Sequence, residues 1–468
     1  MVDIVPTSCR GIPASGLECW GNGPLVGVAM AGIPARAAGR GVAGGEALSR
    51  AGGERCRVER EAMVRSVKPT KDRHTLASAG DILSLVATGA ANSRSALLEA
   101  TGLSRVTVTQ RLGLLLASGL VRETAQTVPS GGRPTRVLGL DTRAGFVLVA
   151  NVGEAFIHVA LMDLEPAILA QATIPFAVQE GPAATLDRLA TQFQALVREA
   201  SCARRFLAGI GFSMPAPVDF TRGRVVGPSV LHGWDEFDIA GHMRRRWDVP
   251  VYVENDVNLM TIYEHRVNFP DTDDLFFIKA GTGIGSGIIS NRRIFRGAQG
   301  AAGDIGHIQL SSADPPLCRC GKLGCVEASA AGWAIARELS RLGIKAENAR
   351  DVIGHVGART PEAIMLLRNA GRVLGEVASD VVSILNPSMI VVGGTLARGE
   401  EFLLSGIREL VYQRCLPLAT RHLQIVLSST SSDSALIGAA YLTLEEIFSR
   451  RNVEDLVARF ETHLARAA

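Results

Sequence analysis

The most specific stretch of this 468-residue sequence is Cys318-Arg319-Cys320-Gly321-Lys322-Leu323-Gly324-Cys325-Val326-Glu327, which follows Gly303-Asp304-Ile305-Gly306-His307. Three thiolates and one imidazole complete a tetrahedral Zn²⁺ shell with no vacant position, which is typical of structural rather than catalytic zinc. Incidental cysteines or a catalytic thiol are the alternatives, but no second histidine stands nearby to act as a base. We therefore predict a structural zinc site whose ligands are His307, Cys318, Cys320 and Cys325.

Length and composition favour a multidomain globular protein. A chain of 468 residues is expected to form two or three domains. Hydrophobic residues make up 47% and charged residues 20%, which suits sizeable cores. No uninterrupted apolar stretch reaches the length of about 20 residues that a transmembrane helix needs. The apolar run Leu25–Ile33 is broken by glycine and proline, so it makes a poor signal peptide. We expect a cytoplasmic protein with no membrane partner.

The first part of the chain carries no periodic pattern. Residues 1 to about 70 are rich in glycine, alanine, proline and arginine, and we predict that they are disordered or poorly ordered. Met63 lies just before the first periodic segment. It is therefore a candidate start of the native chain.

Residues 71–140 show the pattern of a small α+β domain. Apolar spacing predicts helices over residues 76–87 and 93–100, then a turn at 101–103 and a third helix from the N-cap Ser104 to about Ser118. A strand begins near residue 119, and a glycine-rich loop at 130–134 leads to a second strand at 135–140. This order predicts a winged helix-turn-helix DNA-binding domain with a double-stranded operator as its partner.

The third helix would read the DNA. Since Val108 and Leu112 face the core, the opposite face carries side chains suited to base edges: arginine reads guanine and glutamine reads adenine. Arg133, in the loop, can enter a narrow minor groove. The predicted DNA-binding residues are Ser104, Arg105, Thr109, Gln110 and Arg133. The alternative is an ordinary solvated helix face.

Residues 141–468 alternate between strand and helix signals. Strand candidates include 146–152, 157–162, 207–212, 251–254, 275–280, 285–289 and 389–392, and helix candidates include 186–200, 328–342, 363–385 and 403–411. Mixed strands and helices of this kind favour an α/β fold.

Several motifs resemble the ROK family, named for repressors, open reading frames and sugar kinases. The resemblance runs from about Arg73 to Leu444, and it is carried by residues 254–258, 281–287, 318–327 and 386–394. It implies an actin/hexokinase-like domain of two lobes around a sugar cleft, spanning 141–468. It also implies a homodimer or homotetramer.

The resemblance implies sugar-binding roles for Asn255, Asp256, Asp304, His307 and Glu327. Asp256 stands at the position of the catalytic base of the family's kinases, and His307 would serve the zinc and also lie against the sugar. Carboxylates and amides suit this task because they accept or donate hydrogen bonds in pairs. Taken alone, Asp256 is equally well interpreted as a cap or turn residue after a strand.

Departures from the family pattern argue against catalysis. The family's kinases carry an Asp-x-Gly-Gly-Thr loop that cradles ATP phosphates, whereas this chain has Asn151-Val152-Gly153-Glu154-Ala155. Glu154 would repel a phosphate, so we predict no kinase activity and no catalytic residue. Asp304 replaces the usual glutamate, and Pro228-Ser229 replaces a Pro-Asn pair. These changes affect the choice of sugar.

Three functions remain open. The favoured one is a DNA-binding regulator of carbohydrate metabolism genes, a repressor rather than an activator by family habit, which responds to a sugar or sugar phosphate. The second is an ATP-dependent sugar kinase with an accessory DNA-binding domain. In the third, a protein such as a phosphotransferase component replaces the sugar as the signal.

Overall fold

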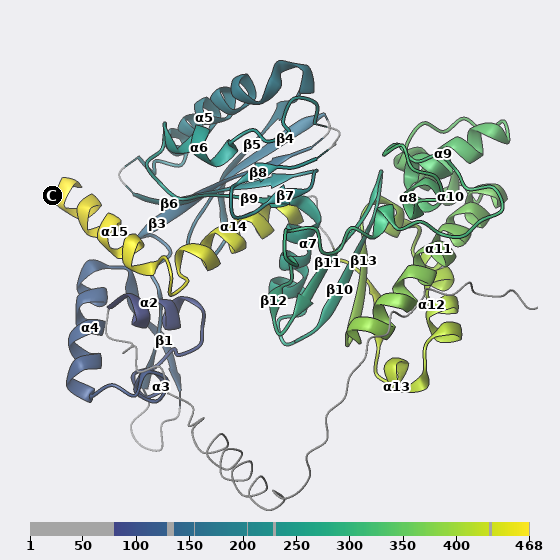
Figure 1. Cartoon of the computed structure of the whole chain (residues 1–468). Coiled ribbons are helices and arrows are strands. Elements are labelled where there is room, and N and C mark those ends of the chain that lie inside the picture. The colour runs from purple at the N-terminus through teal and green to yellow at the C-terminus, as the bar shows by residue number, and fades with distance from the viewer. Residues whose placement is uncertain are drawn as a thin grey trace, which may run out of the picture. The chain divides into compact units, whose positions relative to one another are not determined.

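The computed structural model describes residues 79–128, 135–153, 155–203, 205–227, 231–429 and 433–467 (Figure 1). The chain divides into two units between Lys71 and Asp72, and every described residue belongs to the second unit. The predictions of disorder over residues 1–70 and of a start at Met63 lie outside the described residues.

The first described elements are three helices and a hairpin. They are α2 (Ala79–Ala87), α3 (Arg94–Thr101), α4 (Arg105–Ser118), and the antiparallel strands β1 (Val121–Val128) and β2 (Thr135–Leu140). We call residues 79–140 the head unit. Its order of helices and strands is the predicted one.

Local sequence signals explain where the head's helices begin and end. Ser93 caps α3 and Ser104 caps α4, because each hydroxyl accepts a hydrogen bond from a backbone N–H of the first turn. Gly102 and Gly119 end these helices in the left-handed conformation. The buried core includes Ile82, Leu83, Val86, Leu97, Val108, Leu112, Leu115, Leu120 and Leu138.

A five-stranded mixed sheet follows in the order β5-β4-β3-β6-β9. Its strands are β3 (Gly145–Val152), β4 (Phe156–Met162), β5 (Ile168–Pro175), β6 (Phe206–Met214) and β9 (Val251–Asn255). β3, β6 and β9 are parallel, and β4 and β5 are antiparallel to their neighbours.

Both faces of this first sheet are covered. Figure 1 shows α5 (Gly181–Glu199) and α6 (Ile239–Arg244) on one face and α14 (Ser434–Ile447) on the other. Side chains of β3 alternate accordingly, since Phe146 and Leu148 join the α5 core whereas Val147 and Val149 join the α14 core. A two-stranded ribbon, β7 (Val218–Asp219) and β8 (Arg224–Val225), lies between β6 and α6 in sequence.

A second five-stranded sheet has the order β12-β11-β10-β13-β14. Its strands are β10 (Leu275–Ala280), β11 (Ile284–Ser290), β12 (Arg293–Ile294), β13 (Met389–Gly393) and β14 (Gln424–Leu427). In β10, Phe276 and Ile278 face the core under the later helices, whereas Leu275 and Phe277 face Val257 of α7 (Asp256–Tyr263).

The remaining helices cover the second sheet or close the chain. They are α8 (Val326–Ala330), α9 (Gly332–Arg341), α10 (Ala349–Gly357), α11 (Pro361–Leu385), α12 (Glu401–Arg414), α13 (Pro417–Thr420) and α15 (Val453–Ala467). The single helix predicted over 328–342 is wrong. The backbone is extended at Ala331, where the amide of Gly332 donates to the carbonyl of Gly281.

Two late helices pack on elements made much earlier in the chain. α14 crosses α7 so closely that a Cβ at Gly438 would overlap the backbone of Leu259. α15 packs on α2 and β6, with the ring of Phe460 edge-on to that of Phe206 at 5.1 Å between centroids. The sequence patterns did not predict α15.

The predicted α/β class is confirmed by these two covered sheets. Among the residues described, none of the helices combines the length and the apolar character that spanning a bilayer requires.

Candidate functional site

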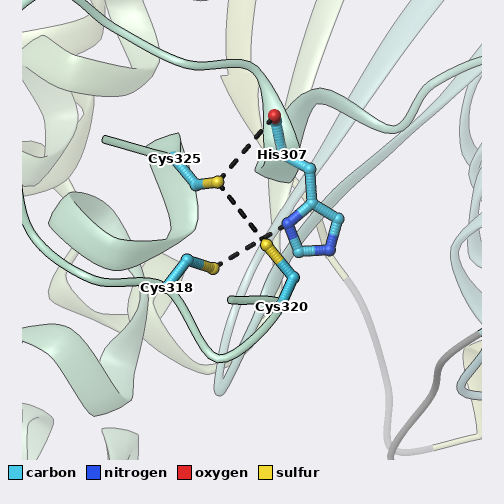
Figure 2. Close-up of side chains that lie close together, drawn as sticks. All are labelled: His307, Cys318, Cys320 and Cys325. Carbon is cyan, nitrogen blue, oxygen red and sulfur yellow. Dashed lines mark hydrogen bonds between the residues drawn. The ribbon is translucent and has the colours of Figure 1, made fainter. Parts of the chain in front are cut away.

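The four predicted metal ligands come together (Figure 2). The ligand atoms of His307, Cys318, Cys320 and Cys325 all lie within 4.8 Å of one another. The Cys320 and Cys325 sulfurs are 3.7 Å apart, and the Cys318 sulfur is 3.9 Å from Nδ1 of His307. A tetrahedron with Zn–S bonds of about 2.3 Å has edges near ~3.8 Å. The donor set and its spacing therefore fit a zinc ion.

Short-range backbone pairing builds this cluster. Leu317 bridges to Leu323, which folds the loop back on itself, and Gln309 bridges to Cys325. His307 ends a 3-10 turn that begins at Ile305, and Cys325 is the residue just before α8. The end of the 3-10 turn, the start of α8 and the tight loop before it therefore bring the four ligands together.

The buried thiols need a cation to ionise. Burial, with the neighbouring cysteine groups, raises the pKa of Cys325 to about 12, and burial also raises the pKa of Cys318. Protein-bound dications deprotonate their thiol ligands outright. Cys318 and Cys325 are therefore poor nucleophiles without a metal, whereas Cys320 is exposed and the backbone and charge of Lys322 lower its pKa.

Asn255 joins β9 to α7. Its Oδ1 accepts from the backbone N–H of Val257 at 2.9 Å, so it caps α7, and its Nδ2 donates to the carbonyl of Ala216 at 3.0 Å. An amide NH₂ group has two hydrogens. One N–H of Asn255 thus remains for a ligand, and the rest of the side chain is structural.

Asp256 has a partner that the sequence analysis missed. Its Oδ2 accepts from Nζ of Lys279 on β10 at 2.5 Å, and the two side chains are 14% and 28% exposed. The pair offers a ligand both an acceptor and a cationic donor.

Glu254, directly before these residues, is a buried anion. Its Oε2 accepts from Nε of Arg296 at 2.6 Å, and its Oε1 accepts from Nδ2 of Asn258 and from the backbone N–H of Asn255. The guanidinium of Arg296 also stacks 3.9 Å from the ring centre of Phe220. This ion pair fixes the start of α7 and hence the direction of Asn255 and Asp256.

Glu327 and Asp304 occupy different environments. Oε2 of Glu327 accepts from the backbone N–H of Ile284 at 3.1 Å, and a Cβ at Gly283 would lie 2.8 Å from it. Glu327 is therefore held against the Gly281–Gly287 loop. Asp304 is exposed and has no hydrogen bond or ion pair to any residue that the structure describes.

The predicted DNA-reading residues of α4 are on its outer side. Ser104, Arg105, Thr109 and Gln110 are exposed, whereas Val108 and Leu112 are buried as predicted. Arg133 lies outside the described residues.

The chain matches one known protein family over most of its length. A model of the ROK family matches residues 148–446. The chain belongs to the ROK family. The matched residues include the His307, Cys318, Cys320 and Cys325 group that could hold a metal, as well as Asn255, Asp256 and Glu327.

Similar proteins include both regulators and kinases. The xylose repressor of Bacillus spizizenii is 27% identical over 354 residues, which covers 75% of this chain and 91% of the repressor. The glucokinase of Halalkalibacterium halodurans is 26% identical over 311 residues, which covers 63% of this chain and 94% of the kinase.

A solved structure of a ROK family transcriptional regulator, described as a homologue of the Escherichia coli MLC protein, aligns with a TM-score of 0.70. Its sequence is 22% identical, and the alignment covers 82% of this chain and 98% of that one. The predicted ROK fold is therefore confirmed.

The segment predicted to correspond to the phosphate loop of ROK kinases includes the last residues of β3, which ends at Val152, and precedes β4, which begins at Phe156. The backbone N–H of Gly153 donates to the carbonyl of Phe156, and Asn151 lies opposite His158 in the sheet. Glu154, Pro228 and Ser229 lie outside the described residues.

Proposed function

We propose that this ROK protein is a DNA-binding transcriptional regulator of carbohydrate metabolism genes, and a repressor in its free state. The observation that carries the proposal is the head unit, three helices and a hairpin joined to the sugar-kinase-like domain. The xylose repressor alignment covers 75% of the chain, more than the glucokinase alignment at 63%. Residues 71–140 form the DNA-binding domain and 141–468 the effector domain.

A decisive experiment measures operator binding. The protein is titrated onto duplexes from its own upstream region in a gel-shift assay, with and without a panel of sugars and sugar phosphates. We expect sequence-specific binding that one compound weakens, since an effector acts only by preferring one state of the protein. Binding that is purely non-specific at all duplexes would contradict the proposal.

Arg105 is expected to contact a base pair, with Ser104, Thr109 and Gln110 beside it. Arg105→Ala should weaken operator binding by about 1–3 kcal/mol and relax the preference at one base pair, because a bidentate contact to guanine is lost. Titration against operator variants measures this. Replacing Arg350, an exposed arginine on α10, provides a control outside the head. Equal affinities of Arg105→Ala and wild type would refute the assignment.

The effector is proposed to be a sugar or sugar phosphate held by Asn255, Asp256, Asp304, His307 and Glu327, together with Lys279. Figure 2 shows that Nδ1 of His307 faces the thiols whereas the second ring nitrogen points away. That nitrogen can hydrogen-bond a hydroxyl while Nδ1 serves the metal. The metal is proposed to be structural Zn²⁺, because four protein ligands leave no open position.

Asp256→Ala should abolish the effector response and leave DNA binding intact. Loss of a charged acceptor costs roughly 1.5–3 kcal/mol, or about 10- to 150-fold in sugar affinity. Calorimetry with the compound that releases the operator measures the loss, and Glu347→Ala, which removes an exposed carboxylate, serves as the control. Wild-type sugar affinity in Asp256→Ala would remove this residue from the site.

The sugar-kinase alternative rests on the retained Asp256 and on the glucokinase relative. The sequence Asn151-Val152-Gly153-Glu154-Ala155 at the position of the kinases' phosphate loop argues against it, because Glu154 would repel a phosphate. A coupled assay of ADP release over hexoses and pentoses separates the two functions. Robust turnover that Asp256→Asn abolishes would favour the kinase. Pull-down from cells grown on different sugars tests for a protein signal instead.

We further propose a cytoplasmic homodimer or homotetramer. Two copies of the head unit would read two half-sites about one helical turn of DNA apart. Sedimentation of the full chain, alone and with a palindromic duplex, tests this.

A further inference from the structure

The outer face of α4 has an apolar centre that the predicted contacts leave out. Val106 is 66% exposed and Leu114 is 65% exposed, although Val108, Leu112 and Leu115 of the same helix are fully buried. At 100° per residue, the exposed positions follow one another around the helix in the order Thr109, Gly113, Val106, Ala117 and Gln110. Val106 and Gly113 lie in the middle of this arc, and Leu114 lies at its edge.

Gly113 has no structural reason to be glycine. A Cβ there would meet no atom within 4 Å, and the residue is neither a cap nor in the left-handed conformation. Glycine in a helix interior is less favourable than alanine, because it loses more backbone freedom. The position therefore lowers the stability of α4 with no packing contact among the described residues, and it leaves the backbone uncovered beside Val106.

The charge of α4 identifies what approaches. The helix carries Arg105 and Arg111 and no carboxylate. Arg105 borders the apolar strip at the start of the helix and no carboxylate of α4 opposes it, so the strip suits the floor of the DNA major groove, which has phosphates on either side. In that groove the one apolar group on a base edge is the C5 methyl of thymine.

We propose that Val106 and Gly113 form the centre of the reading surface of α4. Val106 packs on the C5 methyl of a thymine, and the missing side chain of Gly113 lets the helix axis approach the base edges. Arg105 and Gln110 then make their hydrogen bonds from either side of this contact. The inference rests on the proposed DNA-binding function and names the base feature that the surface recognises.

The test for Gly113 measures two quantities, protein stability and DNA affinity, which Gly113→Ala should change differently. Gly113→Ala should raise or preserve the melting temperature, because alanine favours the helix, yet weaken specific DNA binding by about ten-fold. Gly354→Ala in α10 is the matched control, since a Cβ at Gly354 also meets no atom within 4 Å. It should leave DNA binding unchanged. The probe is the duplex that wild-type protein selects from a random library.

The test for Val106 uses a methyl deletion on each partner. Replacing one thymine at a time by deoxyuridine in the selected duplex should weaken wild-type binding roughly five-fold at a single position. Val106→Ala should weaken it to a similar degree and become insensitive to that deoxyuridine. Leu114→Ala, at the edge of the arc, should keep the wild-type sensitivity.

Failure of the proposed contact at Val106 and Gly113 can be distinguished from failure of the proposed DNA-binding function. If wild-type protein enriches no sequence, the proposed DNA-binding function fails. If it enriches a sequence but Gly113→Ala binds that duplex with wild-type affinity, or Val106→Ala stays sensitive to the deoxyuridine, the inference is overturned and the function stands.

Discussion

Cys325→Ser is expected to release the metal and to destabilise the protein by at least about 3 kcal/mol, because structural zinc contributes roughly 10–16 kcal/mol to the folding of small zinc peptides. Cys325 is fully buried at the start of α8, so its loss also removes the anchor between the loop and that helix. Elemental analysis of freshly purified protein measures the metal. Urea titration measures the free energy of unfolding.

Trp333 supplies a local readout of the same change. The guanidinium of Arg319, between two ligands of the metal loop, lies 4.7 Å from the ring centre of Trp333. Loss of the loop should alter the fluorescence of this tryptophan, and Trp333→Phe identifies its signal. Cys202→Ser, which removes a buried cysteine away from the cluster, should leave the zinc content and the Trp333 signal unchanged. A Cys325→Ser protein with full zinc and unchanged stability would contradict the site.

Arg296→Met is expected to cost about 3–5 kcal/mol, because it leaves the carboxylate of Glu254 buried without its cation. Glu254 is only 2% exposed, and Arg296 is its one ionic partner among the described residues. Thermal and urea unfolding measure the cost. Sugar affinity should fall with it, since Glu254 also holds the backbone of Asn255.

The control for this variant is an exposed pair of similar geometry. Arg414 donates to Glu376 at 2.8 Å, and both side chains are 40% exposed. Arg414→Met should therefore cost no more than about 1 kcal/mol. The double variant Glu254→Gln with Arg296→Met should recover part of the loss, because it removes both charges. Equal costs for Arg296→Met and Arg414→Met would show that burial does not set the strength of the inner pair.

Local patterns predicted the parts of this fold that depend on neighbours in sequence. Caps such as Ser93 and Ser104 set helix starts, and the spacing of Cys318, Cys320 and Cys325 set the metal loop. The apolar face of α4 was predicted from the helical spacing of its apolar residues. Strand β2 has the predicted bounds, Thr135–Leu140. These features are fixed within a few residues, so a sequence is enough to find them.

Contacts between distant residues escaped prediction. Lys279 meets Asp256 across 23 residues, and Arg296 meets Glu254 across 42. Neither pair leaves a periodic signal, because only the sheet order brings the partners together. One trace was present: Lys279 is one of five lysines in the chain and interrupts the apolar strand Leu275–Ala280. A lone charge in a buried strand indicates a partner.

The late packing of α14 and α15 has a consequence for how the protein is made. The first sheet is built from residues 145–255, yet the helix that covers its second face begins only at Ser434. Contacts between residues so far apart in sequence form slowly during folding. During translation the apolar side of that sheet must stay exposed until residues 434–447 have emerged from the ribosome. Nascent chains that stall after residue 430 would thus be targets for chaperones and proteases, and fusions placed at the C-terminus would act on the last step of folding.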